Sequence, residues 1–223
     1  MEVEPEDLLQ AFAPMLPAGA ALAELGALED ASPLFEEERS QIASAINKRQ
    51  REFRAGRCCA RRALAQLGVQ ACAISAGPDR APVWPTGVVG SISHCEGYAV
   101  AVVARSETCR GIGVDVESRG RVGARIWRRI ATELERETLS RLAPEAAREH
   151  ATRLFGAKEA FYKAQYQITR GWVGFQDAAV ELEGSAFALR LLVDVAGLAA
   201  QGAVFRGEQR LAGGRLLSLL WLS

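Results

Sequence analysis

Three acidic side chains and one lysine occur in patterns that could bind a metal ion and phosphate. Asp115 and Glu117 are two residues apart at the end of the apolar run GIGVDVE (111–117). If this run is a β-strand, both side chains point to one face, where two carboxylates repel each other unless a cation lies between them. Mg²⁺ takes hard oxygen ligands and accepts phosphate oxygens among them. The alternative is that GVDVE is a strand end that leads into solvent.

The other acid and the lysine lie in LFGAKEAFYKAQY (154–166), which has a helical pattern. Glu159 and Lys163 are at i and i+4, so they share one face of the helix. This face borders an apolar stripe, where partial burial could change the protonation of the pair. The alternative is a solvent-exposed pair that stabilises the helix by a few tenths of a kcal/mol.

A third candidate group is Ser93 with His94, in the segment SISHCEGYAV (91–100). Both residues directly follow a strand-like run, and His94 is one of only two histidines in the chain. A histidine in such a turn can bind an anionic ligand, or it can be structural or solvated.

Hydrophobic periodicity and turn residues predict the elements that must position these side chains. Helices are expected at 36–46, at 48–67, at 133–142 and from Pro144 to about Tyr166. Strands are expected at 71–75, 88–93, 98–104, 111–117, 178–183, 187–193, 203–206 and 216–222. Residues 1–32 are rich in Ala and Leu and contain several prolines, which predicts an irregular or short-stranded lead-in.

The order of helices followed by strands occurs twice, which predicts an α+β protein of two similar halves. We expect an N-terminal half at 1–112 and a C-terminal half at 113–223. No linker-like stretch separates them, so residues 111–115 would form a shared seam between the halves.

Composition limits the classes of function. The 223 residues are 49% hydrophobic, enough for one large domain or two small ones. The 27 basic and 27 acidic residues balance, so no overall field favours nucleic acid. The N-terminus MEVEPEDLLQ lacks the pattern of a signal peptide, and no window has the roughly 18 apolar residues of a membrane span. The five cysteines form no CxxC motif, which is typical of small core residues in a reducing cytoplasm.

Four motifs, in this order, are similar to those of the phosphopantetheinyl transferases, specifically the larger Sfp-type members that activate siderophore and antibiotic synthetases. They are EFRAGRCCARRAL (52–64), GPDRAPVWP (77–85) followed by GSISH (90–94), GIGVDVE (111–117) and FGAKEAFYKA (155–164). The last resembles the family pattern W-x-x-K-E-A-x-x-K, with Phe155 in place of the Trp. The motifs cover about residues 40–170, and residues 1–35 match no part of the pattern.

The resemblance implies a pseudo-dimeric fold, with coenzyme A in a cleft between two similar halves. It implies that Asp115, Glu117 and Glu159 bind Mg²⁺ or Mn²⁺. Catalytic roles are implied for Glu159, Lys163 and Asp115, with Lys163 facing the phosphates. The positions that match the nucleotide-binding residues of the family are Arg80, Ser93 and His94, and those in its first basic helix are Arg51 and Arg57.

On this resemblance, a serine hydroxyl of a carrier protein attacks the β-phosphorus of coenzyme A, and 3′,5′-ADP leaves. Phosphoryl transfer of this kind depends on positioning and on neutralising charge. The metal would bridge the pyrophosphate oxygens and offset the charge of the leaving phosphate. Glu159 is the candidate base, either directly or through a metal-bound water, and both routes stay open.

The implied partner is an acyl or peptidyl carrier protein, whose surface is acidic. The arginine-rich segment GRVGARIWRRI (120–130) could receive an acidic helix, or it could be a solvated helix start with Trp127 in the core. Fatty-acid, polyketide and nonribosomal peptide carriers all remain open, although the two-half form hints at secondary metabolism. A pseudo-dimer has little need of a partner, so a monomer is expected.

Two other classes of function compete with a transferase. A generic magnesium phosphohydrolase would use the same acids, but it would need neither the SISH turn nor the basic helix. A non-catalytic module that binds carrier proteins or coenzyme A would have no need to keep Asp115, Glu117, Glu159 and Lys163 together.

Overall fold

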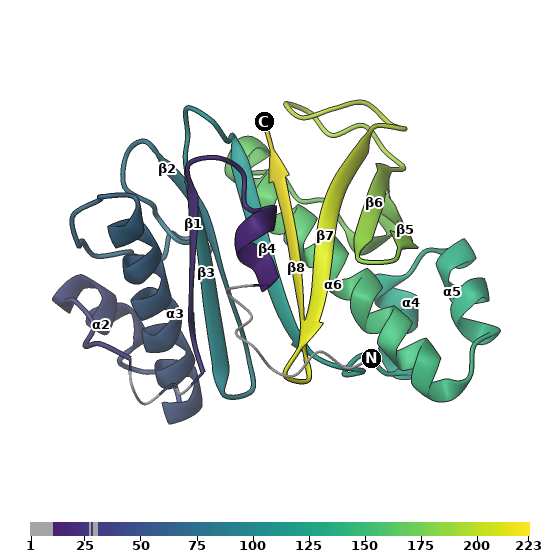
Figure 1. Ribbon diagram of the computed structural model, residues 1–223, viewed down its shortest axis with the longest axis horizontal. Coiled ribbons are helices and arrows are strands. Elements are labelled where there is room, and N and C mark those ends of the chain that lie inside the picture. The colour runs from purple at the N-terminus through teal and green to yellow at the C-terminus, as the bar shows by residue number, and fades with distance from the viewer. Residues whose placement is uncertain (1–10, 27, 29–30) are drawn as a thin grey trace.

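The computed structural model describes residues 11–26, 28 and 31–223, and it has helices packed on two antiparallel sheets (Figure 1). The strands are β1 (Ala20–Leu25), β2 (Val88–Cys95), β3 (Tyr98–Arg105), β4 (Gly111–Ser118), β5 (Ala178–Glu183), β6 (Ala186–Leu191), β7 (Val204–Ala212) and β8 (Arg215–Leu222). The α-helices are α2 (Glu36–Ile42), α3 (Asn47–Gln66), α4 (Trp127–Ile130), α5 (Glu133–Ser140) and α6 (Pro144–Thr169). Short 3-10 helices are η1 (Ala13–Met15), η3 (Ala124–Ile126) and η4 (Phe175–Asp177).

The first sheet has the order β1-β3-β2, so β3 lies in its centre. Side chains of a strand alternate between two faces, and β3 is buried on both. Ala99, Ala101 and Val103 pack in one core with α3. The residues between them pack in another core, together with β4 and β8 of the second sheet. A strand that is apolar on both faces therefore joins the two halves of the chain.

The second sheet has the order β4-β8-β7-β6-β5, and α6 packs on β4 and β8. Two glycines of β4 allow this helix to approach the strand closely. A Cβ atom on Gly113 would overlap the carbonyl oxygen of Ala160, and one on Gly111 would overlap that of Ala164. The glycines of GIGVDVE thus bring the polar face of α6 next to the acidic end of β4.

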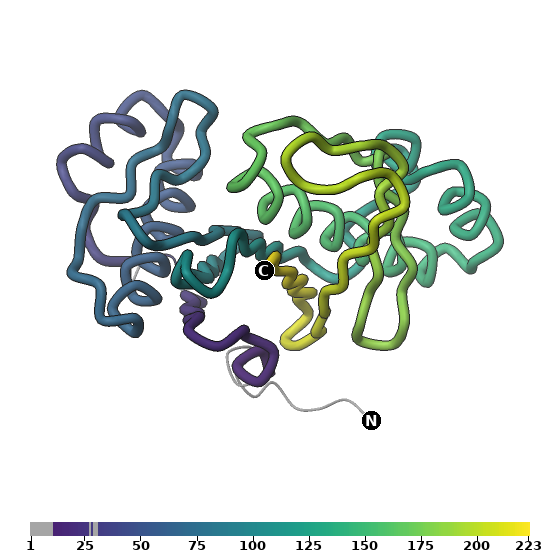
Figure 2. The backbone as a smooth tube through the Cα atoms, turned by 90° about the horizontal axis from the view of Figure 1, so that it is seen from above, coloured from purple at the N-terminus to yellow at the C-terminus, as the bar shows by residue number. Residues whose placement is uncertain are grey.

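The two sheets meet where β2 runs beside β4, and side chains connect the two backbones there. Ser91 Oγ donates to the carbonyl oxygen of Val114 at 3.4 Å. The Gln167 side chain accepts from the Gly90 amide at 3.0 Å and donates to the Ile112 carbonyl at 2.7 Å. Figure 2 shows the two lobes on either side of this seam, one containing α3 and the other α6.

Most of the predicted elements are present, and the described part confirms the mixture of helices and sheets. The predicted strand at 71–75 is wrong, because this segment has no ladder partner. Side chains bind its backbone instead: the Ile74 amide donates to Glu38 Oε1 at 2.8 Å, and Arg57 Nε donates to the Ile74 carbonyl at 2.6 Å. β4 begins at Gly111, so it lies across the predicted boundary between residues 112 and 113. No described helix has the length and apolar character needed to span a membrane.

Candidate functional site

Asp115 and Glu117 lie on β4 with exposed fractions of only 4% and 8%. Neither residue therefore lies at a solvent-exposed strand end, which the sequence left open as the alternative to a metal site. The neighbouring helix α6 carries Glu159 and Lys163 one turn apart, and the glycines of β4 bring this helix against the strand. The structure thus brings all four of these predicted residues into one region.

Lys163 is the cation at the centre of this group. Its Nζ atom donates to Asp115 Oδ1 at 2.7 Å, to Ser93 Oγ at 3.1 Å and to the Val114 carbonyl at 3.1 Å. An ammonium group has three donors, so these contacts satisfy Lys163 fully. The lysine holds α6, β4 and β2 together at the seam.

Asp115, Glu117 and Glu159, with Lys163 among them, form what we call the acidic group, and Ser93 lies inside it. Its hydroxyl donates to Asp115 Oδ1 at 2.9 Å and accepts from the Val116 amide at 3.2 Å. The residue is buried. In this structure Ser93 orients Asp115, whereas the resemblance implies a contact with the nucleotide.

The carboxylates have the charge and donor chemistry that a hard divalent cation needs. Asp115 Oδ2 is buried and has no hydrogen-bond partner. Burial and the charge of Asp115 raise the pKa of Glu117 to about 7. Burial also raises the pKa of Glu159, with Asp115 acting in the same direction and Lys163 opposing it. Oxygen ligands suit Mg²⁺, and a bound cation would favour the ionised form of all three acids.

Asp115 and Glu117 each pair with a basic side chain of the protein itself. Arg121 donates to Glu117 Oε2 at 2.6 Å, and Asp115 is paired with Lys163. Among the described residues, no three His, Cys, Asp or Glu side chains converge as metal ligands. The three acids therefore suit Mg²⁺ in chemistry and charge, while Asp115 and Glu117 are paired with protein cations.

His94 belongs to a separate group at the start of α3. Arg49 Nη1 lies 3.0 Å from His94 Nε2, and Glu52 Oε2 lies 3.8 Å from its Nδ1. A guanidinium group can only donate, so Nε2 accepts and the ring is neutral in this arrangement. Burial lowers the pKa of His94, and Glu52 opposes this shift. Arg49 is a basic residue of this group that sequence reasoning missed.

A cleft of about 740 Å³ lies between α6 and the first sheet. The turn at 77–84 and strand β2 line one side, and residues of α6 with Arg170 line the other. Its basic side chains are Arg80, Lys163 and Arg170. The predicted residues Arg80 and Lys163 therefore share this cleft, while His94 is outside its lining.

Arg51 and Arg57 of α3 are not among the residues that line the cleft. Arg57 is buried, with its guanidinium group 4.1 Å from the Phe53 ring centre and bonded to the Ile74 carbonyl. Burial lowers its pKa to about 10. Arg51 is exposed beside the groove between α2 and α3. Binding of coenzyme A by these two residues stays a prediction.

Lys158 and Lys163 both belong to the motif KEAFYK, but they have different environments. Lys158 Nζ is buried and donates to Glu135 Oε2 at 2.6 Å, to the Phe175 carbonyl at 2.8 Å and to the Ile130 carbonyl at 3.0 Å. Glu135 also accepts from the amides of Thr132 and Val180. Lys158 therefore ties α6 to α5 and β5, and only Lys163 reaches the cleft.

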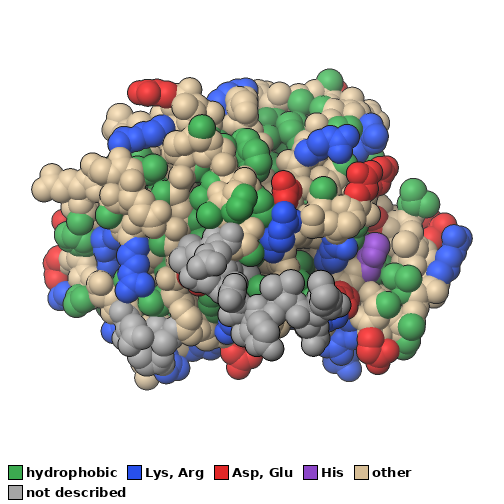
Figure 3. All heavy atoms as spheres, in the orientation of Figure 1, with side chains coloured by type: hydrophobic (Ala, Val, Ile, Leu, Met, Phe, Trp, Pro, Cys, Tyr) green, Lys and Arg blue, Asp and Glu red, His purple; other side chains and the backbone are tan. Residues whose placement is uncertain are grey.

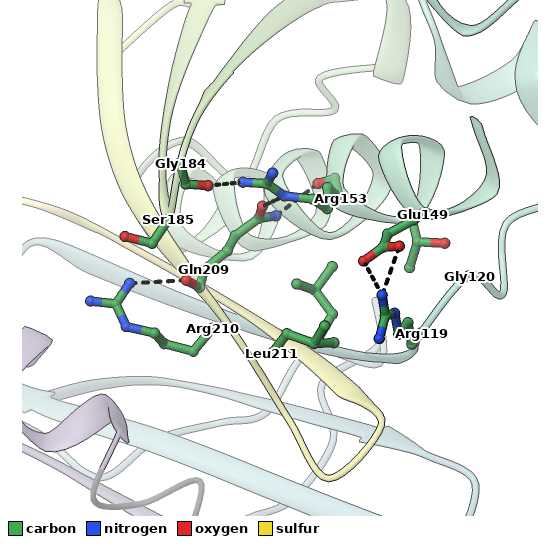
Figure 4. A pocket seen from close by; sticks show the side chains of 11 residues that line it. Arg119, Gly120, Glu149, Arg153, Gly184, Ser185, Gln209, Arg210 and Leu211 are labelled. Carbon is green, nitrogen blue, oxygen red and sulfur yellow. Dashed lines mark hydrogen bonds and ion pairs between the residues drawn. The ribbon is translucent and has the colours of Figure 1, made fainter. Parts of the chain in front are cut away.

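A second pocket of about 320 Å³ lies on α6, β7 and the turn at 184–185, and its polar groups are paired with each other (Figure 4). Arg153 Nε donates to Gln209 Oε1 at 2.9 Å, and Arg119 donates to Glu149 Oε2 at 3.1 Å. Gln209 also donates to Ser218 Oγ, and Ser218 is the register partner of Asp115. No predicted site residue lines this pocket; its Gln209 supports β8 behind the acidic group.

The arginine-rich segment borders a third pocket of about 630 Å³. Ile126, Arg128 and Trp172 line it, and Trp172 is 76% exposed. Trp127 is half-buried against the core of this half. Figure 3 shows that basic and acidic side chains are interspersed on the face that it presents, so a basic contact surface on this face would be a local one.

Two family models match the chain, one after the other along the sequence. Residues 36–104 match the family model of the 4′-phosphopantetheinyl transferase N-terminal domain, and residues 111–213 match that of the 4′-phosphopantetheinyl transferase superfamily. The chain is 40% identical over 169 residues to the 4′-phosphopantetheinyl transferase Npt of Nocardia iowensis, which covers 76% of this chain and 75% of that protein. It is 41% identical over 165 residues to PptT of Mycobacterium tuberculosis, covering 71% and 72%. Enterobactin synthase component D of Escherichia coli O157:H7 is 38% identical over 142 residues, covering 61% and 65%.

Proposed function

Because the chain belongs to the 4′-phosphopantetheinyl transferase superfamily, we propose that the cleft beside Lys163 is where it binds coenzyme A. The protein is an enzyme that transfers the phosphopantetheine arm of coenzyme A to a carrier protein. The single observation that supports this location is the position of Lys163. This residue lines the cleft and also contacts Asp115, so a phosphate attracted by the charge of the lysine would lie next to the acids.

The fold supports a pseudo-dimeric arrangement of two halves, 1–112 and 113–223. Each half has one long helix packed on an antiparallel sheet, α3 in the first and α6 in the second. The proposed cleft takes one side from each half. Such a chain can complete its site without a second subunit, so we propose that it acts as a monomer.

The proposed reaction begins with the carrier serine aligned with the β-phosphorus of coenzyme A. Lys163 places a positive charge beside the pyrophosphate, and Arg80 binds towards the nucleotide end. Glu159 accepts the serine proton directly or through a water molecule. Burial, which raises the pKa of Glu159, favours proton acceptance, and a bound cation would oppose it. Asp115, Glu117 and Glu159 would hold Mg²⁺, which when bound supplies positive charge that stabilises the transferring and leaving phosphates.

The metal proposal can be tested without turnover. Mn²⁺ bound to the protein is measured by electron paramagnetic resonance, with and without Asp115→Asn. We expect the variant to lose most of the bound Mn²⁺, because it removes a buried carboxylate whose Oδ2 atom has no other partner. Unchanged binding would show that the metal lies elsewhere.

We propose that the carrier protein docks beside η3 and α4. Arg125 and Arg128 are exposed there, next to the half-exposed Ile126 and the exposed Trp172. Basic side chains around an apolar centre suit an acidic helix. The similarity to enterobactin synthase component D supports carriers of secondary metabolism as the substrates.

Mass spectrometry of carrier proteins incubated with coenzyme A and Mg²⁺ tests the function. A transferase adds the mass of phosphopantetheine to the carrier and releases 3′,5′-ADP. A magnesium phosphohydrolase would cleave coenzyme A without modifying the carrier, and a binding module would change neither. Separate incubations with fatty-acid, polyketide and nonribosomal peptide carriers identify the preferred acceptor.

A further inference from the structure

An acidic side chain lies inside the cleft that we propose for an anionic substrate. Of the described residues that line the cleft, Asp79 alone is acidic, against three basic ones. Its Oδ2 atom accepts a hydrogen bond from Tyr166 Oη at 2.7 Å and lies 3.9 Å from Arg170 Nη1. These two partners come from the end of α6, on the other side of the cleft from Asp79.

The turn that carries Asp79 holds its carboxylate towards α6. Asp79 Oδ1 accepts from the Ala81 amide at 3.0 Å, and two backbone hydrogen bonds at Gly77 close the turn. With Oδ1 used within the turn, Oδ2 is left to contact the opposite side. The contact therefore bridges the two halves of the molecule across the cleft.

The backbone is strained on both sides of this contact. Arg80 has φ 66° and Arg170 has φ 53°, and in the described part of the chain they are the only non-glycine residues with positive φ. This left-handed conformation is unfavourable for residues with a Cβ atom, and such residues cluster at ligand clamps and functional sites. Here both are arginines, both line the same cleft, and both lie beside Asp79.

The two partners of Asp79 can bind a phosphate as well as a carboxylate. A phenol and a guanidinium group donate hydrogen bonds to phosphate oxygens in the same way as to a carboxylate. Coenzyme A carries several negative charges, and the Asp79 carboxylate would repel them in this cleft. A bound phosphate and Asp79 would therefore compete for the same donors.

We infer that Tyr166 and Arg170 bind a phosphate group of coenzyme A, and that Asp79 occupies these two residues when no substrate is bound. Asp79 then acts as an internal competitor that the substrate displaces. The inference rests on the proposed function, because it takes coenzyme A as the ligand of the cleft. It adds three residues to substrate selection, none of which is among the site residues predicted from the sequence.

The test measures coenzyme A affinity by isothermal titration calorimetry. Asp79→Asn keeps an acceptor for the Ala81 amide but removes the charge, so we expect it to bind coenzyme A about threefold to tenfold more tightly than wild type. Arg170→Gln should bind about tenfold more weakly, and Tyr166→Phe should also bind more weakly. In the double variant with Arg170→Gln, Asp79→Asn should improve binding much less, because the donor for which they compete is gone.

A surface ion pair on α5 provides matched controls. Arg141 and Glu137 are 3.7 Å apart and exposed. Glu137→Gln and Arg141→Gln make the same charge changes away from the cleft, and they should leave coenzyme A affinity unchanged. An equal change in these controls would assign the effect to net charge and overturn the inference.

The alternative is that Asp79 only holds the turn in place. In that case Asp79→Asn would bind coenzyme A no better than wild type, which overturns the inference. Arg170→Gln leaves the turn itself unaltered, so unchanged affinity in this variant overturns it independently, even if Asp79→Asn unfolds more readily. Failure of the proposed function is distinguishable, because then wild type itself would neither bind coenzyme A nor modify a carrier.

Discussion

Negative charge at the acidic group is only partly compensated by protein cations. Lys163 and Arg121 each pair with one carboxylate, Asp115 and Glu117, whereas Glu159 meets these two cations only at longer range. Bringing three carboxylates together in a buried region raises the free energy of the ionised state. A bound cation would stabilise this ionised state, which is consistent with the proposed role in phosphoryl transfer.

Glu117 should make the stability of the metal-free protein depend on pH. Its pKa rises from 4.5 to about 7 on folding, because of burial and Asp115. The folded state then binds more protons than the unfolded state between these values, so its stability falls as pH rises through about 7. We expect urea unfolding of wild type to show this loss and Glu117→Gln to show much less of it. A loss of the same size in both proteins would assign it to another group.

Glu159→Gln keeps the volume of the side chain but removes its charge and its ability to accept a proton. We expect kcat for carrier modification to fall about a hundredfold or more. The matched control is Glu145→Gln, an exposed acid in the first turn of the same helix, which should retain its rate. A nearly normal kcat for Glu159→Gln would mean that this residue acts neither as a base nor as a metal ligand.

At the scale of elements, the site depends on how closely α6 packs against β4. The helix carries Glu159, the proposed base, and Lys163, while the strand carries Asp115 and Glu117, and two glycines of the strand allow the contact. Lys158 supports the helix from its other side through a buried ion pair with Glu135. Breaking a pair of this kind leaves a buried charge without its partner, so we expect loss of Lys158 to displace α6.

Gly113→Ala tests this close packing. The new Cβ atom would overlap the carbonyl oxygen of Ala160, so the helix must shift away from the strand. We expect the free energy of unfolding to fall by about 1–3 kcal/mol or more, and carrier modification to slow because Lys163 moves away from Asp115. Gly123→Ala is the control, since its Cβ would have no atom within 4 Å. If Gly113→Ala were as stable as wild type, α6 could move away from β4 without a loss in the free energy of unfolding.

At the scale of the whole molecule, the two proposed ligands approach different surfaces. On our proposals, coenzyme A would enter between the halves, whereas the carrier protein would dock on the C-terminal half alone, beside η3 and α4. Substitutions on one surface should therefore change the affinity for one substrate and leave the affinity for the other unchanged.

Reversing Arg125 and Arg128 to Glu tests this separation. We expect KM for an acidic carrier to rise and this effect to weaken at high salt. Exposed charges mainly change the rate at which the two proteins associate, and salt screens them. The affinity for coenzyme A should be nearly unchanged. Reversing Arg190 and Arg206, two exposed arginines on β6 and β7, makes an equal charge change as a control. Equal loss of both affinities, or no loss of either, would reject this docking surface.

Local patterns in the sequence determined the elements and the chemical groups of the site. The strand at 98–104, the spacing of Asp115 from Glu117 and that of Glu159 from Lys163 follow from the local sequence, so they could be predicted without the fold. The segment at 71–75 shows the limit of such patterns. It looks like a strand, but its backbone is bound by Glu38 and Arg57 from other elements.

Only the tertiary structure decided which partner each side chain meets. Lys158 and Lys163 share one motif, yet one is buried beside Glu135 and the other faces the cleft. Asp79 and Tyr166 are 87 residues apart in the chain, and nothing local to either residue indicates their contact. Helical and strand periods specify which face a side chain occupies, whereas the packing of whole elements decides what lies opposite that face.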